Sequence, residues 1–60
     1  MVKVYRLNAL PSGRLSETLL AQFTEINDAV TYSKNYAIRH TINTLVVYAD
    51  GSVDIHYPGA

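Results

Sequence analysis

The sequence predicts an α+β fold in which strands and a helix follow the order ββαββ. We expect a two-layer sandwich with one helix packed on a mainly antiparallel sheet. Two turn signals, Pro11-Ser12-Gly13 and Asp50-Gly51, mark the predicted hairpins. Between them, residues 24–42 have the apolar spacing of an amphipathic helix. With 60 residues, the chain is expected to form one domain over residues 1–60.

The first predicted hairpin joins a clear strand to an ambiguous segment. Residues 2–10 are rich in Val, Tyr and Leu and indicate a strand that ends near Ala9. In residues 14–23, Leu15, Leu19 and Phe23 share one face of a strand, but they also repeat at the four-residue spacing of a helix. Because the turn to the first strand is short, we predict a second strand here.

The predicted helix has polar residues near both ends and a narrow apolar face. Thr24 or Asn27 is expected to cap its start, and Asn43 is expected to stop it. The face that repeats at three- and four-residue spacing consists of small and medium-sized side chains: Ile26, Ala29, Val30, Ser33 and Ala37. Such a face allows the helix to lie close to a sheet but buries little area per residue.

The last hairpin is compatible with two registers. A two-residue loop at residues 50–51 pairs Val46 with Ile55. A three-residue loop at residues 49–51, with its glycine in the left-handed region, pairs Leu45 with Ile55 instead. A shift between the two exchanges the faces of the whole strand.

We prefer the three-residue loop, because we expect it to turn Leu45 toward the core and to leave the amphipathic Tyr48 outside. Val46, Tyr48 and His56 are then predicted to lie on the back of the sheet, which the helix leaves uncovered. In either register, apolar residues remain off the core face. A bare apolar surface is typical of an association site.

Composition limits the function classes. Five basic and five acidic residues cancel, which argues against a dedicated nucleic-acid-binding protein. The absence of cysteine excludes disulfides and thiolate metal sites. No apolar run approaches the ~20 residues of a membrane span, so we expect a cytoplasmic protein without membrane contact. Since so short a chain is marginally stable alone, we also expect a partner.

Residues 13–59 resemble the short bacterial ββαββ domains of unknown function. The matching pieces are Asp28-Ala29 at the helix start, Leu45-Val46-Val47, Asp50-Gly51 and Tyr57. Members of that family often carry an aromatic residue in the second strand, where this chain has Ser-Glu-Thr-Leu-Leu at residues 16–20. The resemblance implies the ββαββ fold, but it implies no activity because the family has none assigned.

No pattern of residues predicts catalysis, a cofactor or a metal site. Asp54 and His56 share one strand face, but a metal site or a base with its orienting group needs further ligands that converge with them. His40 lies near the helix end, where a cation is favoured by the helix dipole. The serines lack the sequence context of a nucleophile, and residues 11–16 do not form a phosphate-binding loop.

We therefore predict a non-catalytic protein-interaction module, a homodimer that also serves as an adaptor or inhibitor of a larger, unidentified protein. The predicted interface residues are Val46, Tyr48 and His56 on the back of the sheet, with Tyr32, Tyr36 and Arg39 on the helix flank. Tyrosine and arginine are enriched at energetically important interface positions. The alternative is a weak nucleic-acid-binding accessory protein that uses Lys3, Arg6, Arg14, Lys34 and Arg39.

Overall fold

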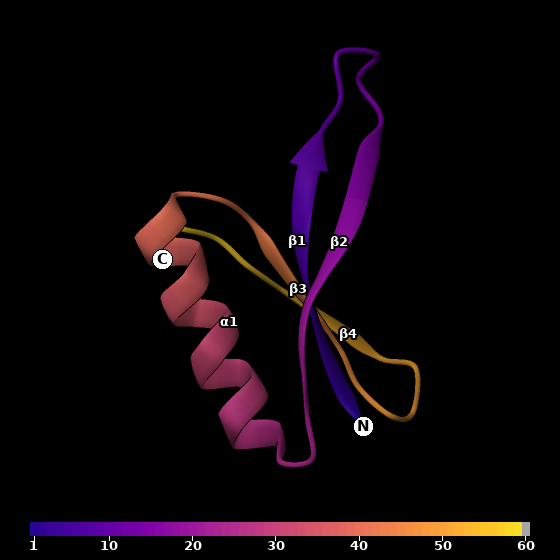
Figure 1. Cartoon of the computed structure of the whole chain (residues 1–60), viewed down its shortest axis with the longest axis vertical. Helices are drawn as coiled ribbons and strands as arrows, with labels where there is room; N and C mark the ends of the chain where they lie inside the picture. The colour runs from indigo at the N-terminus through magenta and orange to yellow at the C-terminus, as the bar shows by residue number, and fades with distance from the viewer. Residues whose placement is uncertain (60) are drawn as a thin grey trace.

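The computed structural model describes residues 1–59 and confirms the α+β fold with one helix packed on an antiparallel sheet (Figure 1). The sheet has the strand order β2-β1-β3-β4, so β2 and β4 form its edges. The elements are β1 (Val2–Ala9), β2 (Leu15–Phe23), α1 (Ile26–His40), β3 (Thr44–Val47) and β4 (Val53–His56).

The first hairpin confirms that residues 14–23 contain a strand. Leu10 N–H donates to the Arg14 carbonyl, and Gly13 N–H donates to the Leu10 carbonyl. Gly13 has φ 85°, a left-handed conformation that glycine adopts without steric cost. Farther along, the register shifts opposite Val4 and Tyr5, where Leu20 is the extra residue of a bulge in β2.

Both predicted helix caps are wrong. The N-cap residue is Glu25, whose backbone is extended and whose side chain makes no capping hydrogen bond. Only residues 24–25 separate β2 from α1, so this short connection fixes where the helix begins. At the other end, Thr41 takes the left-handed conformation (φ 52°) and its N–H bonds to the Ala37 carbonyl, so the helix stops before Asn43. Asp28 in the first turn and Arg39 in the last agree with the helix dipole.

The last hairpin has the preferred three-residue loop. Tyr48 N–H donates to the Ser52 carbonyl, and Gly51 N–H donates to the Tyr48 carbonyl. Gly51 has φ 90°, which is the left-handed glycine that this loop requires. Leu45 accordingly pairs with Ile55.

The expected orientation of this hairpin, however, is wrong. Val46 is fully buried and packs with Val2, Val4 and Ala29 in the core under α1. Since neighbouring residues of a strand point to opposite faces, Leu45 and Val47 lie on the face that α1 does not cover. The other residues predicted for the back of the sheet, Tyr48 and His56, share the helix side with Val46.

The part of α1 that meets the sheet is narrower than predicted. Ala29, Ser33 and Ala37 are buried, while Val30 is half-buried and Ile26 is exposed. Small side chains at these positions let α1 lie close to β1 and β3. Within residues 1–59, no helix has the length and apolar character needed to cross a membrane.

Candidate functional site

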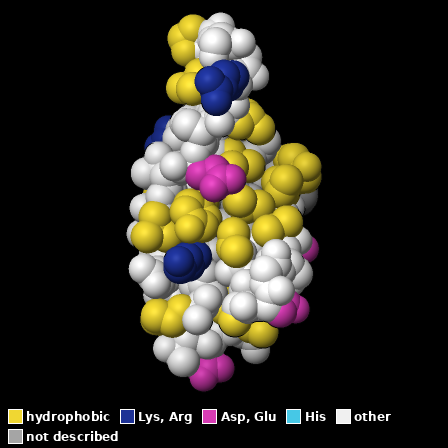
Figure 2. Space-filling view, turned by 90° about the vertical axis from the view of Figure 1, so that its right-hand side faces the viewer, with side chains coloured by type: hydrophobic (Ala, Val, Ile, Leu, Met, Phe, Trp, Pro, Cys, Tyr) yellow, Lys and Arg dark blue, Asp and Glu magenta, His cyan; other side chains and the backbone are white. Residues whose placement is uncertain are grey.

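The face of the sheet opposite α1 carries a continuous set of apolar side chains, which we call the open face. Figure 2 shows this side of the molecule, with yellow apolar side chains covering its centre. Strand alternation and the pairing register assign the following residues to it: Lys3, Tyr5, Leu7, Ala9, Leu15, Glu17, Leu19, Gln22, Leu45, Val47, Val53 and Ile55. Most of them are apolar, although they lie on the face that α1 does not cover.

The centre of the open face is one apolar row that crosses all the strands. Tyr5 on β1 pairs with Leu19 on β2 and with Leu45 on β3, and Leu45 pairs with Ile55 on β4. Leu45 is only 8% exposed, whereas Leu19 and Ile55 at the two ends are 46% and 44% exposed. The middle of the row is thus shielded by its neighbours in the sheet, and its ends face water.

Two opposite charges flank this central row. Lys3 pairs with Val47 on one side of the row, and Glu17 pairs with Leu7 on the other. Lys3 and Leu7 are separated along β1 by about 13 Å, given the rise of ~3.3 Å per residue in a strand. Tyr5 lies midway between them. The open face is therefore apolar at its centre, with one positive and one negative charge at opposite ends.

The residues predicted for the back of the sheet contribute to the fold on the helix side. Val46 belongs to the core. The Tyr48 hydroxyl donates to Asp54 Oδ2 at 2.6 Å, and this hydrogen bond to a carboxylate raises the pKa of Tyr48 above its ordinary value. This hydrogen bond joins the two strands of the last hairpin. Val46 itself is fully buried and has no exposed surface for a partner.

His56 joins a buried polar cluster between α1 and the sheet. Its Nδ1 lies 2.7 Å from Ser33 Oγ, which lies 2.6 Å from Thr44 Oγ1. Burial is the main cause that lowers the pKa of His56, and Lys34 lowers it further, while Asp54 acts in the opposite direction. Ser33 is fully buried, so its hydroxyl is inaccessible to a substrate and the contact with His56 is a structural one.

On the helix flank, the predicted interface residues form an aromatic stack. Tyr32 lies between Phe23 of β2 and Tyr36, with ring centroids 5.3 Å and 6.1 Å away. The Tyr36 ring lies 4.1 Å from the ring of His40. Tyr32 packs against the core, whereas Arg39 is exposed beside the stack. These residues do lie together, but on another side of the molecule from the open face.

The basic residues of the alternative function are not gathered on one face. Lys3 is on the open face, while Arg6 points to the helix side and donates from Nη1 to the Tyr36 hydroxyl at 3.3 Å. Arg14 lies by the first hairpin turn, and Lys34 and Arg39 lie on α1. Among residues 1–59, no group of three or more His, Cys, Asp or Glu side chains could hold a metal ion.

The sequence prediction missed the residues that make up the open face, although it expected an apolar surface there. It assigned the more apolar set of the last hairpin, including Leu45, to the core. The available signal was Ser33, which lies in the middle of the helix face and needs a buried hydrogen-bond partner. Thr44 and His56 pair in register and provide that partner, which places their face under the helix.

Comparisons with models of known protein families, with curated proteins and with solved structures found no match. The resemblance to bacterial ββαββ domains therefore stays a prediction.

Proposed function

We propose that this chain is a non-catalytic, cytoplasmic protein-interaction module that forms a homodimer through its open face. The observation that carries the proposal is the apolar row of Leu19, Tyr5, Leu45 and Ile55, which crosses the entire sheet without a covering layer. Exposed apolar patches of this kind mark association surfaces. Two sheets can bury such rows by packing face to face at a separation of about 10 Å.

The charges on the open face favour a second copy of the chain as the partner. A two-fold axis that lies in the interface and crosses the strands at Tyr5 reverses the direction along β1. It brings Lys3 of one copy next to Glu17 of the other, and symmetry repeats the pair. A self-complementary surface of this kind needs no other partner. The net charge of zero also leaves little repulsion between copies.

The size of the open face sets the expected affinity. Four strands spaced ~4.8 Å apart and about five residues of ~3.3 Å along each give a footprint on the order of 300 Å². Standard interfaces bury about 800 Å² per partner, and smaller ones are usually weak. We therefore expect a weak dimer that dissociates on dilution.

Sedimentation velocity over a concentration series tests this proposal. Leu19→Lys places a charge in the central row on both copies, so we expect dimerisation to weaken at least about tenfold. Ile26→Lys is the matched control, because Ile26 is similarly exposed (55% against 46%) but lies at the start of α1. A monomer at all concentrations, or equal weakening by both variants, would overturn the open-face dimer.

Reversal of the flanking charges tests self-pairing directly. Lys3→Glu or Glu17→Lys alone places like charges together twice in the dimer and should weaken it several-fold. The double variant restores opposite charges and should regain most of the affinity. If the double variant loses as much dimerisation affinity as the two single variants lose together, the surface that binds the open face is not a second open face.

A role as an adaptor or inhibitor of a larger protein would use the same surface. In that case the partner would compete with self-association, and Leu19→Lys would remove both interactions. The spread of the basic residues over both faces of the sheet does not favour the nucleic-acid-binding alternative.

A further inference from the structure

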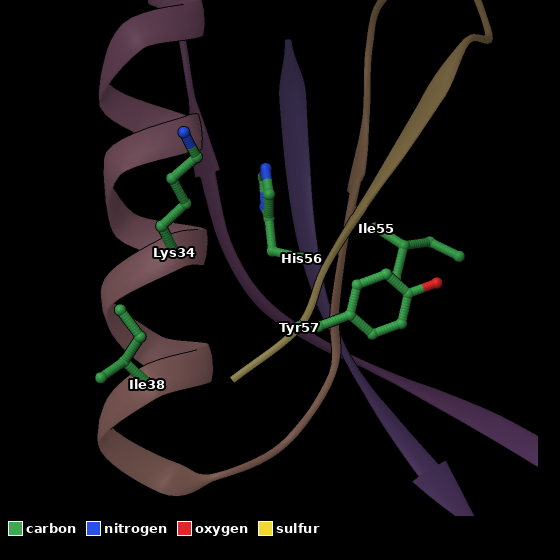
Figure 3. A pocket seen from close by; sticks show the side chains of 5 residues that line it. All are labelled: Lys34, Ile38, Ile55, His56 and Tyr57. Atoms are coloured by element: carbon green, nitrogen blue, oxygen red, sulfur yellow. The ribbon is translucent and has the colours of Figure 1, made fainter. Parts of the chain in front are cut away.

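A second feature, which shares Ile55 with the open face, is a cleft between α1 and the free edge of β4. Its volume is about 220 Å³, and its lining is mainly apolar. Lys34 and Ile38 of α1 form one wall, and residues 55–57 form the other (Figure 3). Ligand pockets for drug-sized molecules measure about 300–1,000 Å³, so this cleft suits a smaller ligand.

The buried polar cluster fixes which nitrogen of His56 carries a proton. Thr44 Oγ1 must donate to the Ser33 carbonyl at 3.0 Å, because a carbonyl oxygen can only accept. The single hydroxyl proton of Thr44 is used in that bond, so Ser33 Oγ must donate its own proton to Thr44 Oγ1 in their 2.6 Å contact. The 2.7 Å contact between Ser33 Oγ and His56 Nδ1 therefore needs a proton on Nδ1. In the neutral ring, Nε2 is consequently the unprotonated nitrogen.

The free nitrogen of His56 shares the cleft with a cation. In Figure 3 the Lys34 side chain and the imidazole ring extend in the same direction from α1 and β4. Lys34 is the charged group of α1 that acts on the ring, and Asp54 is the one of β4. Asp54 already accepts a hydrogen bond from Tyr48. Protonation of Nε2 would place a second positive charge beside Lys34, and an anion between the two would relieve their repulsion.

The edge of β4 adds main-chain groups to the same cleft. Tyr48 and Ser52 form a hydrogen-bonded pair, so the bonded positions of β4 are the alternate residues Ser52, Asp54 and His56. The main-chain groups of Ile55 and Tyr57 therefore point away from β3, toward the free edge. Figure 3 shows their side chains on the opposite side of the strand from His56, so we infer that their main chain lines the cleft.

We propose that this cleft binds a small monocarboxylate with a short apolar chain, with the carboxylate between Lys34 and His56 and the chain against Ile38. The imidazole takes up one proton at Nε2 from solvent and donates it in a hydrogen bond to the carboxylate. Binding and protonation are linked, so the ligand binds more tightly as the pH falls. The pKa of His56 rises by the same linkage when the ligand is bound.

Hexanoate is the probe, and NMR of the His56 ring is the measurement. We expect saturable binding that raises the pKa of His56 by about one unit, which corresponds to roughly tenfold tighter binding at low pH than at high pH. The ring nitrogen shifts of the free protein should show the proton on Nδ1. Hexan-1-ol lacks the charge and acetate lacks the chain, so each should bind at least about tenfold more weakly.

Matched lysine variants locate the site. Lys34→Gln should weaken hexanoate binding about tenfold, whereas Lys3→Gln, on the opposite side of the sheet, should leave it unchanged. An unshifted pKa of His56, equal binding of hexan-1-ol, or equal effects of the two variants would overturn the proposal. N-acetyl-leucine presents the same chemistry as a peptide terminus. If N-acetyl-leucine binds more tightly than hexanoate, the natural ligand is the C-terminus of a peptide. If hexanoate binds more tightly, the natural ligand is a free carboxylic acid.

One variant separates hexanoate binding in the cleft from dimerisation through the open face. Leu19→Lys disrupts the open face but lines no part of the cleft. Hexanoate should therefore bind this variant normally, and a failure of either proposal leaves the other intact.

Discussion

The orientation of β3 is tested most directly by making the same substitution at two adjacent residues. Val46 is fully buried in the core, while Val47, the next residue, lies half-buried on the open face. Val→Ala removes the equivalent of two methylene groups at each position. At Val46 the lost transfer free energy is about 1.6 kcal/mol, and the cavity left beside Val4 and Ala29 raises the cost to roughly 2 kcal/mol.

At Val47 the same change should cost less than about 1 kcal/mol, because part of the side chain is already in water and no closed cavity forms. In a domain of this size, about 2 kcal/mol lowers Tm by roughly 10 °C. Thermal unfolding followed by circular dichroism separates the two variants. The protein must be dilute enough to be monomeric, since Val47 would also be buried in a dimer.

The contrary result is that Val47→Ala destabilises the dilute protein more than Val46→Ala does. That result would mean that Leu45 and Val47 face the helix, as the sequence prediction had it. The open face would then consist of the alternate residues, and the dimer proposal would lose its basis.

Three further outcomes are expected. Thr44→Val removes the hydroxyl that donates to the Ser33 carbonyl, so chemical denaturation should show a loss of about 1–3 kcal/mol. Burial lowers the pKa of His56 in the folded state below its ordinary value of 6.5, so the unfolded chain binds more protons as the pH falls. Chemical denaturation should therefore show a loss of stability as the pH falls below about 7, and this dependence should flatten in His56→Gln. Gly51→Ala should cost about 1 kcal/mol because Gly51 has φ 90°, whereas Gly59→Ala, without such a φ, should change stability little.

The elements of the fold were predictable because their signals are local. Gly13 and Gly51 occupy the left-handed positions of two three-residue hairpin loops, and the turn residues Pro11-Ser12-Gly13 and Asp50-Gly51 indicated both turns. The four-residue repeat in residues 14–23 was ambiguous, and the short hairpin connection decided it correctly in favour of a strand. The helix caps were not predictable from residue preference. The connection from β2 leaves only residues 24–25, and the left-handed Thr41 ends α1 early.

The face of the last hairpin could not be predicted from apolar content, because both faces carry apolar residues. The assumption that the more apolar face is the buried one put Leu45 in the core and Val46 outside. The helix in this protein, however, buries Ala29, Ser33 and Ala37. Such small residues bring the backbone of the helix close to the sheet and leave no space there for a row of large side chains.

The polar residue in that helix face decides the orientation. Ser33 must find hydrogen-bond partners where it is buried, because an unsatisfied buried hydroxyl costs about 1–3 kcal/mol. The face with Thr44 and His56 offers them, and Val46 lies on this face, whereas Leu45 lies on the other one. The same constraint thus has two consequences. It leaves the larger apolar side chains uncovered on the open face, and it holds the His56 ring with Nε2 free at the edge of β4.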